Sequence, residues 1–127
     1  MEDYKAILKM IESVDPNDTV KLDEIDMEVS LYLKPERRAD LIRRKMIWYI
    51  PSAKYTRTRD ALKAIRPKSA SITLYEMNNG GGFILGVRCV LEFMNGKKVF
   101  SPNKLLPTEE LAELHAIIQA IAYERGQ

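Results

Sequence analysis

The sequence predicts an α+β fold, in which a small antiparallel β-meander is flanked by helices in an α-β-α sandwich-like arrangement and N-terminal helices precede the sheet. Three observations predict it. Residues 83–94 alternate apolar and mixed side chains, as a strand with one buried face does. Glycine-containing turns stand on both sides of that run. The segments before and after this region carry apolar residues at helical spacing.

The predicted sheet has one long central strand and two shorter neighbours. The three strands are expected at residues 71–77, 83–94 and 97–101. Every odd position of the long strand is apolar, and these residues are Phe83, Leu85, Val87, Cys89, Leu91 and Phe93. At about 3.3 Å per residue this strand is longer than strands usually are, so we expect a bend at Gly86.

The turn after the long strand sets the register of the third strand. Asn95-Gly96 is the strongest short signal of a two-residue hairpin turn, because both central residues must take positive φ. A turn of that length pairs Leu91 with Phe100 and Glu92 with Val99. The apolar faces of the two strands then match, which supports this register.

Helical periodicity predicts helices at residues 2–14, 22–33, 56–65 and 108–124. In the second helix the inward stripe is Leu22, Ile25, Val29 and Leu33, and the outward acidic residues are Asp23, Glu24, Asp26 and Glu28. The third helix begins at the N-cap Thr56, with one face formed by Thr58, Ala61, Leu62 and Ile65. Residues 36–50 are expected to form a helix and then a short strand. The third and fourth helices should cover the odd face of the long strand.

Composition is that of one globular domain. The 127 residues are 46% apolar and 30% charged, and we treat residues 1–127 as one domain, with a helical part at 1–35 and a sheet-plus-helix core at 36–127. The acidic start and the lack of an eighteen-residue apolar run predict neither a signal peptide nor a membrane span, and hence a cytoplasmic protein without a membrane partner. The single cysteine, Cys89, is expected to be an inert core thiol.

Charge is unevenly distributed along the chain. Residues 1–36 carry four basic and ten acidic side chains, residues 37–68 carry eleven basic and two acidic ones, and residues 69–127 have a net charge of −1. The acidic and basic thirds could neutralise each other within the monomer or across an oligomer interface. Alternatively, the basic residues could line a concave anion site, since arginine matches phosphate well. The basic residues are Arg37, Arg38, Arg43, Arg44, Lys45, Lys54, Arg57, Arg59, Lys63, Arg66 and Lys68.

The search for catalytic motifs favours binding over catalysis. The sequence contains no G-x-S-x-G, H-E-x-x-H or P-loop motif and no Cys/His cluster with metal-ligand spacing. We therefore expect a protein that is not an enzyme and that has neither a metal nor a cofactor. The only histidine, His115, borders the apolar stripe of the last helix and is expected to be structural.

The order of elements resembles a known group of phage proteins. The chain has an aromatic-Thr start at Tyr55-Thr56 of a short helix, strands around Gly80–Gly82, and a Pro107-Thr108 start of a final Ala/Leu/Ile helix. Together with the opening helix that starts at Leu22, this order resembles the phage ABA-sandwich domain group over about residues 20–124. That resemblance extends to the Thoeris anti-defence sponges and related CBASS-type counter-defence proteins. It implies a protein that acts in the host cytoplasm and sequesters a cyclic nucleotide without cleaving it.

A binding site can be suggested within this framework. Arg88 is the only basic side chain inside the long strand, so we expect it to grip phosphate together with Arg57 or Arg59. The stacking aromatic would be Phe83 or Tyr55, with Trp48 and Tyr49 nearby in the basic third, although these rings could equally be core residues. Gly81 and Gly82 would allow close approach of a ligand, unless the glycine run is only a flexible hairpin tip.

Two binding functions thus stay open at the level of sequence. The resemblance implies a cyclic ADP-ribose-type or cyclic oligonucleotide ligand. The alternative is an oligomeric interaction protein whose basic belt contacts nucleic acid or other copies of the chain. A homo-oligomer, either a dimer or a dimer-based hexamer, is expected in both cases, because large opposed charges are often paired across an interface.

Overall fold

The computed structural model describes residues 4–36, 53–78, 81, 84–93 and 98–127. The predicted elements at 36–50, the glycine tip and the Asn95-Gly96 turn therefore lie largely or wholly outside the described residues. Among the described helices, none is long and apolar enough to cross a membrane. The elements are α1 (Tyr4–Ser13), α2 (Thr19–Leu33), α4 (Arg59–Lys63), β1 (Ala70–Asn78), β2 (Ile84–Phe93), β3 (Val99–Phe100) and α5 (Glu109–Glu124).

The sheet has the predicted class and topology. Its order is β1-β2-β3 and both neighbouring pairs are antiparallel, so the α+β meander preceded by N-terminal helices is confirmed. Leu91 pairs with Phe100 and Glu92 pairs with Val99, as the turn length predicts. The register between the two long strands pairs residues 72 and 74 with 91 and 89, which places apolar side chains of both strands on one face.

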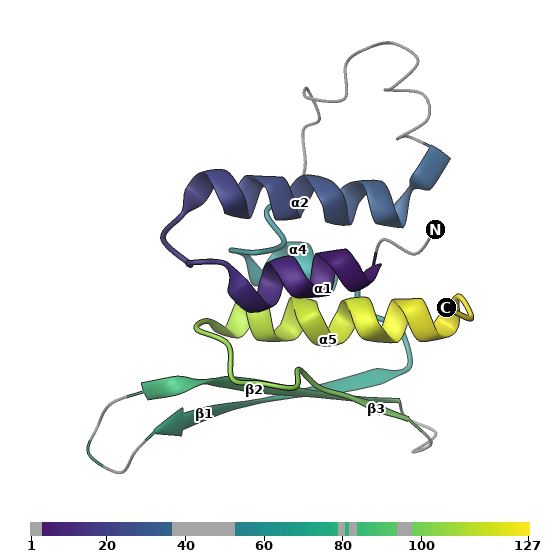
Figure 1. The fold of residues 1–127 in the computed structure, drawn as a ribbon. Helices are drawn as coiled ribbons and strands as arrows, with labels where there is room; N and C mark the ends of the chain where they lie inside the picture. Colours follow the sequence, from purple (N-terminus) through teal and green to yellow (C-terminus); the bar gives the residue numbers. More distant parts are fainter. Residues whose placement is uncertain (1–3, 37–52, 79–80, 82–83, 94–97) are drawn as a thin grey trace.

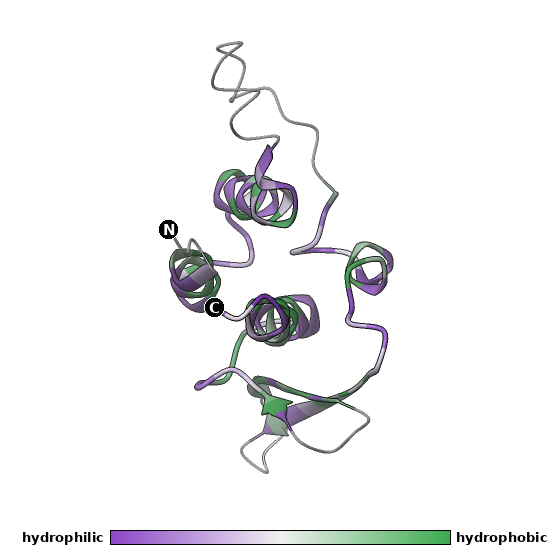
Figure 2. Ribbon diagram, turned by 90° about the vertical axis from the view of Figure 1, so that its right-hand side faces the viewer, coloured by the Kyte–Doolittle hydropathy of each residue, from purple (hydrophilic) through white to green (hydrophobic). Residues whose placement is uncertain are grey.

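Helix α5 lies directly on the sheet, and the other helices surround it (Figure 1). It contacts all three strands on one side and α1 and α4 on the others, while α2 packs on α1. In Figure 2 the described helices lie on the same side of the sheet, over the face that carries Cys89. The side chains on the opposite face include the exposed Tyr75 and Arg88.

Burial of α5 is almost complete, which explains its apolar sequence. Every residue from 111 to 118 is buried, and so are Ala120 and Ala122. A helix that is apolar nearly all round must be enclosed on all sides, as α5 is between the sheet and α1. The Thr108 hydroxyl oxygen accepts a hydrogen bond from the Leu111 amide at 3.2 Å. Thr108 of the predicted Pro107-Thr108 start is therefore the N-cap of α5.

Several sequence predictions need correction. Asp26 was expected to face out from the second helix, but it is 1% exposed, because it accepts hydrogen bonds from residues 56 and 57. Thr56 is not an N-cap: α4 begins at Arg59, and the buried Thr56 belongs to the preceding turn. Helix α4 contacts α5 and no strand, so the sheet is covered by α5 without it.

The predicted bend at Gly86 is confirmed as a break in the β1–β2 register. Met77 pairs with Gly86, whereas Asn78 pairs with residue 84, which leaves Leu85 without a partner in the ladder. Leu85 is 61% exposed, so the odd-face alternation holds from Val87 to Phe93 and fails at this bulge.

Gly86 is required at the bulge for two reasons. Its φ is +154°, and a β-carbon added to it would lie 2.7 Å from the Leu105 β-carbon. The adjacent residue Val87 exchanges two backbone hydrogen bonds with Leu106, at 2.7 and 3.0 Å. The segment after β3 therefore pairs antiparallel with β2 beside the glycine before it continues to the start of α5.

Gly86→Ala should lower the free energy of unfolding by about 1–3 kcal/mol, because a β-carbon would overpack the contact with Leu105. Gly126→Ala is the matched control, since Gly126 has φ +75° and open space around it. The control substitution should lower the free energy of unfolding by only about 1 kcal/mol, through backbone strain. Urea unfolding of both variants measures the difference. Equal midpoints for the two variants would show that the pairing of this segment with β2 does not depend on glycine.

Candidate ligand-binding site

Arg57, expected to bind phosphate, is engaged by carboxylates of α2. Its Nη2 lies 2.8 Å from Asp26 Oδ2 and also pairs with Asp23. These carboxylates raise the pKa of Arg57, with the hydrogen bond to Asp26 as the largest cause. Asp26 Oδ1 also accepts the Thr56 amide at 2.9 Å, and Lys54 Nζ lies 3.1 Å from Asp23 Oδ1. Arg57 therefore fixes the turn before α4 to α2.

The contact between α2 and the turn before α4 shows where part of the opposite charge of the acidic and basic thirds is paired. Asp23 and Asp26 belong to the acidic third of the chain, while Lys54 and Arg57 belong to the basic third. Opposite charges of the two segments are therefore paired inside the monomer. On Asp23, the hydrogen bonds from Arg57 and then Lys54 lower the pKa of the carboxyl.

Arg59 is likewise engaged, by carboxylates of α5. Its Nη1 donates to Glu109 Oε2 at 3.0 Å, and its Nη2 lies 3.1 Å from Glu113 Oε1. Arg66 joins the same group, with Nη2 2.6 Å from Glu113 Oε2. Glu113 is 0% exposed. The two arginines neutralise a buried carboxylate and hold α4 against α5.

The other predicted site residues are dispersed. Arg88 is exposed on the sheet face opposite Cys89, so the structure does not bring it to Arg57 or Arg59. Tyr55 is partly buried and packs against the hydrophobic core, which favours its role as a core aromatic. Gly81 is exposed, while Gly82, Phe83, Trp48 and Tyr49 lie outside the described residues.

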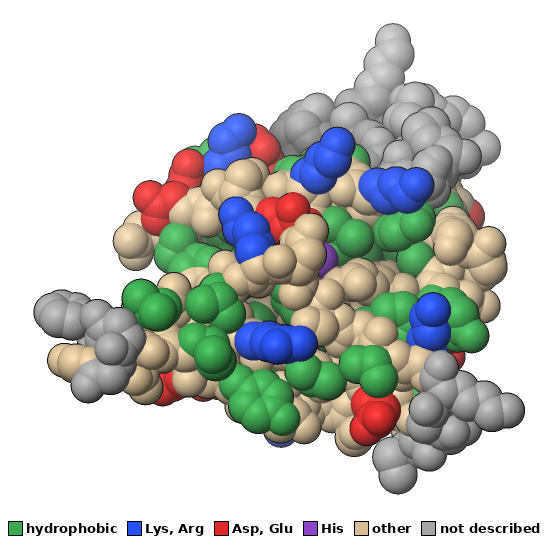
Figure 3. Space-filling model, turned by 60° about the horizontal axis from the view of Figure 1, so that its bottom comes forward, with side chains coloured by type: hydrophobic (Ala, Val, Ile, Leu, Met, Phe, Trp, Pro, Cys, Tyr) green, Lys and Arg blue, Asp and Glu red, His purple; other side chains and the backbone are tan. Residues whose placement is uncertain are grey.

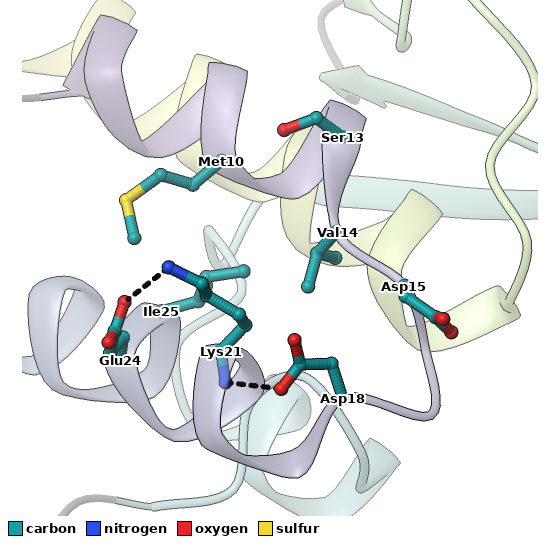
Figure 4. A pocket seen from close by; sticks show the side chains of 8 residues that line it. All are labelled: Met10, Ser13, Val14, Asp15, Asp18, Lys21, Glu24 and Ile25. Atoms are coloured by element: carbon teal, nitrogen blue, oxygen red, sulfur yellow. Dashed lines mark hydrogen bonds and ion pairs between the residues drawn. The ribbon is translucent and has the colours of Figure 1, made fainter.

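One hollow of about 340 Å³ lies between α1 and α2 (Figure 4). Its apolar wall is formed by Met10, Val14 and Ile25. Its rim carries three carboxylates and one lysine, Lys21, whose Nζ lies 3.7 Å from Glu24 Oε2. A negative rim disfavours an anionic ligand.

A second hollow of about 380 Å³ lies where α1, α5 and β3 meet, and we call it the lysine–aromatic hollow. Its nine lining residues are Tyr4, Lys5, Leu8, Lys98, Phe100, Gln119, Ala122, Tyr123 and Gln127. None of the nine is acidic, and two are lysines. Figure 1 shows the start of α1 beside the end of α5, which is how residues from both ends of the chain form one site.

Aromatic rings and ammonium groups are interleaved in this hollow. Lys98 Nζ lies 5.3 Å from the centre of the Tyr123 ring, and Lys5 Nζ lies 6.0 Å from the centre of the Tyr4 ring. The Tyr123 ring is 5.5 Å from that of Phe100. Rings of this kind can stack on a planar base, and ammonium groups can pair with phosphate. The hollow therefore has the chemistry of a site for a planar anion.

Gln119 is held in place at the wall of the hollow. Its Nε2 donates to the Ser101 carbonyl at 3.0 Å and lies 2.8 Å from His115 Nδ1. An amide NH₂ can only donate, so Nδ1 accepts and the proton of the neutral imidazole lies on Nε2. The Nε2 of His115 then donates to Glu12 Oε2 at 2.8 Å, and this hydrogen bond links α5 to α1. The expectation that His115 is structural fits this network.

Sequence reasoning missed the hollow because its residues are far apart in the chain. The signal that exists is weak: Lys98 precedes the apolar pair Val99-Phe100, and Tyr123 is one helical turn beyond the amide Gln119. Neither pattern indicates a site without the fold. The described residues contain no group of three or more His, Cys, Asp or Glu side chains placed to hold a metal. Burial raises the pKa of the Cys89 thiol to about 12, as expected for an unreactive core cysteine.

Comparison of the chain with protein-family models, with curated proteins and with solved structures finds no match.

The His115 network makes folding stability depend on pH. Burial lowers the pKa of His115 below its ordinary value of 6.5, against the opposing effect of Glu12. The unfolded chain then binds more protons than the folded one below pH 6.5, so stability is fully present above that pH and falls as the pH decreases toward the folded pKa. Urea unfolding from pH 8 to pH 5, compared with His115→Gln, measures this contribution. The stability difference between parent and variant should shrink on acidification, and a constant difference would contradict the assignment.

Proposed function

We propose that this protein is a non-catalytic binding protein that sequesters a cyclic nucleotide signal in the lysine–aromatic hollow. The observation that carries the proposal is the meeting of two lysine ammonium groups and three aromatic rings around one concave space. The resemblance to phage counter-defence sponges supports a cyclic ADP-ribose-type or cyclic oligonucleotide ligand.

Electrostatics support this choice over the α1–α2 hollow, which is of similar size. Small-molecule sites are concave, measure about 300–1,000 Å³ and combine apolar walls with a few polar groups. The lysine–aromatic hollow, at about 380 Å³, and the α1–α2 hollow, at about 340 Å³, both fall in this range, so charge decides between them. Two lysines and no acidic side chain line the lysine–aromatic hollow, whereas three carboxylates surround the α1–α2 hollow.

Binding without cleavage agrees with the lining. Hydrolysis of a phosphodiester needs a general base, a nucleophile or a metal close to phosphorus. None of the nine lining side chains is a carboxylate, an imidazole or a thiol, so the lining offers only lysine and tyrosine as proton-transfer groups. The groups that are present can pair with charge, stack and donate hydrogen bonds, which is what sequestration requires.

Thermal unfolding with a panel of cyclic and linear nucleotides tests the proposal. A ligand at 100 times its dissociation constant should stabilise the parent by about 2.7 kcal/mol. Lys5→Gln combined with Lys98→Gln should abolish most of this stabilisation, because both phosphate partners are removed. Lys9→Gln combined with Lys104→Gln is the matched control, since both lysines are exposed and outside the lining. The nucleotide recovered after denaturation should be intact.

Three outcomes would contradict the proposal. One is that no nucleotide stabilises the parent. Another is that the Lys5/Lys98 variant and the Lys9/Lys104 control lose nucleotide-induced stabilisation equally. The third is that the recovered ligand is cleaved. Salt dependence separates the alternative in which the partner is nucleic acid. Binding to a long phosphate backbone weakens steeply with salt, whereas a single small ligand that contacts two lysines should have a shallow slope.

A further inference from the structure

We infer that the outer face of the sheet is the interface of a two-fold symmetric homodimer. We define the outer sheet face by Ser71, Thr73, Tyr75, Arg88, Val90, Glu92 and Val99, which alternate with inward-facing residues of the three strands. In Figure 3, where this side of the molecule comes forward, hydrophobic side chains lie beside basic and acidic ones. This inference does not depend on the proposed nucleotide site.

The first argument is the state of the charges on this face. Among the arginines that the structure describes, Arg88 is the one whose guanidinium forms no hydrogen bond or ion pair with another described residue. Glu92, on the same strand and face, also has no ion pair within the described part of the chain. Four residue steps along the strand separate them by about 13 Å, too far for a pair within one copy.

The second argument is that this spacing is self-complementary. Val90 lies midway between Arg88 and Glu92. When two copies pack face to face around a two-fold axis through Val90, the two central strands run antiparallel, and each Arg88 lies over Glu92 of the partner subunit. Two ion pairs then form that one copy cannot make alone.

The third argument is the apolar surface between and beside these charges. Tyr75 is paired with Arg88 in the ladder and is 49% exposed, and Val99 is paired with Glu92 and is 51% exposed. Two sheets packed face to face at about 10 Å would bury these side chains together with Val90. Exposed apolar groups in line with complementary charges are typical of the surface of a specific interface.

The same charges argue against nucleic acid as the partner of this face. A phosphate backbone that pairs with Arg88 would run beside Glu92, which repels it. A second copy of the chain uses both charges. The proposed partner of this face is therefore a second copy of the chain, and binding of nucleic acid to this face would overturn the proposal.

Sedimentation equilibrium of the full chain tests the interface by charge reversal. Arg88→Glu and Glu92→Arg should each raise the dimer dissociation constant at least about tenfold, because each places like charges opposite one another. The double variant, Arg88→Glu with Glu92→Arg, should restore dimerisation. Both residues are exposed, so circular dichroism should show an unchanged fold in all three variants.

The outcomes are decisive in either direction. A dimer that each single reversal weakens and the double reversal restores supports the interface. A monomeric parent, single variants that stay dimeric, or a double variant as weak as the single ones would overturn it. Salt-dependent binding of single-stranded nucleic acid by the parent, lost in Arg88→Glu, would also overturn it.

Discussion

The buried carboxylate of Glu113 is the constraint on which the arrangement of helices depends. An ionised group that is 0% exposed is tolerated only when opposite charge surrounds it. Arg59 and Arg66 supply that charge from the two ends of the α4 region, and both remain partly exposed. Because Glu113 lies on the central helix, the pairs fix the segment 59–66 against α5 without any contact of α4 with the sheet.

Both proposed surfaces follow from the central position of α5. Its middle is buried between the sheet and α1, and near its C-terminal end Gln119 and Tyr123 line the lysine–aromatic hollow. Toward the sheet, α5 covers the face that carries Cys89. The outer sheet face is left to solvent or to a partner. The proposed ligand site and the proposed dimer interface are therefore separate surfaces of one sheet–helix unit.

The local parts of the fold could be predicted from sequence because they depend on periodicity and turn length. The alternation from Val87 to Phe93 and the pairs at Leu91 and Glu92 are examples. Asp26 shows the limit: periodicity places it among exposed acidic residues, yet Arg57 and the Thr56 amide bury it.

The candidate site was beyond sequence reasoning for the same reason. The arginines of the basic third looked like a phosphate site, but Arg57 and Arg59 have carboxylate partners that come from α2 and α5, at least 31 residues away. The lysine–aromatic hollow combines the first helix, β3 and the last helix. Its existence depends on how α1 and β3 pack on α5, which no local pattern encodes. The resemblance to phage counter-defence proteins expected from the sequence carries no information on this placement.

The most direct measurement of this account is the free energy of unfolding of Glu113→Gln compared with Glu110→Gln. Both residues lie on α5, but Glu110 is only partly buried and has no ion pair among the described residues. Removing the buried charge leaves two guanidinium groups without their partner, so Glu113→Gln should lose about 2 kcal/mol or more. Glu110→Gln should change stability by less than about 0.5 kcal/mol. Equal, small losses in the two variants would contradict the central role of Glu113.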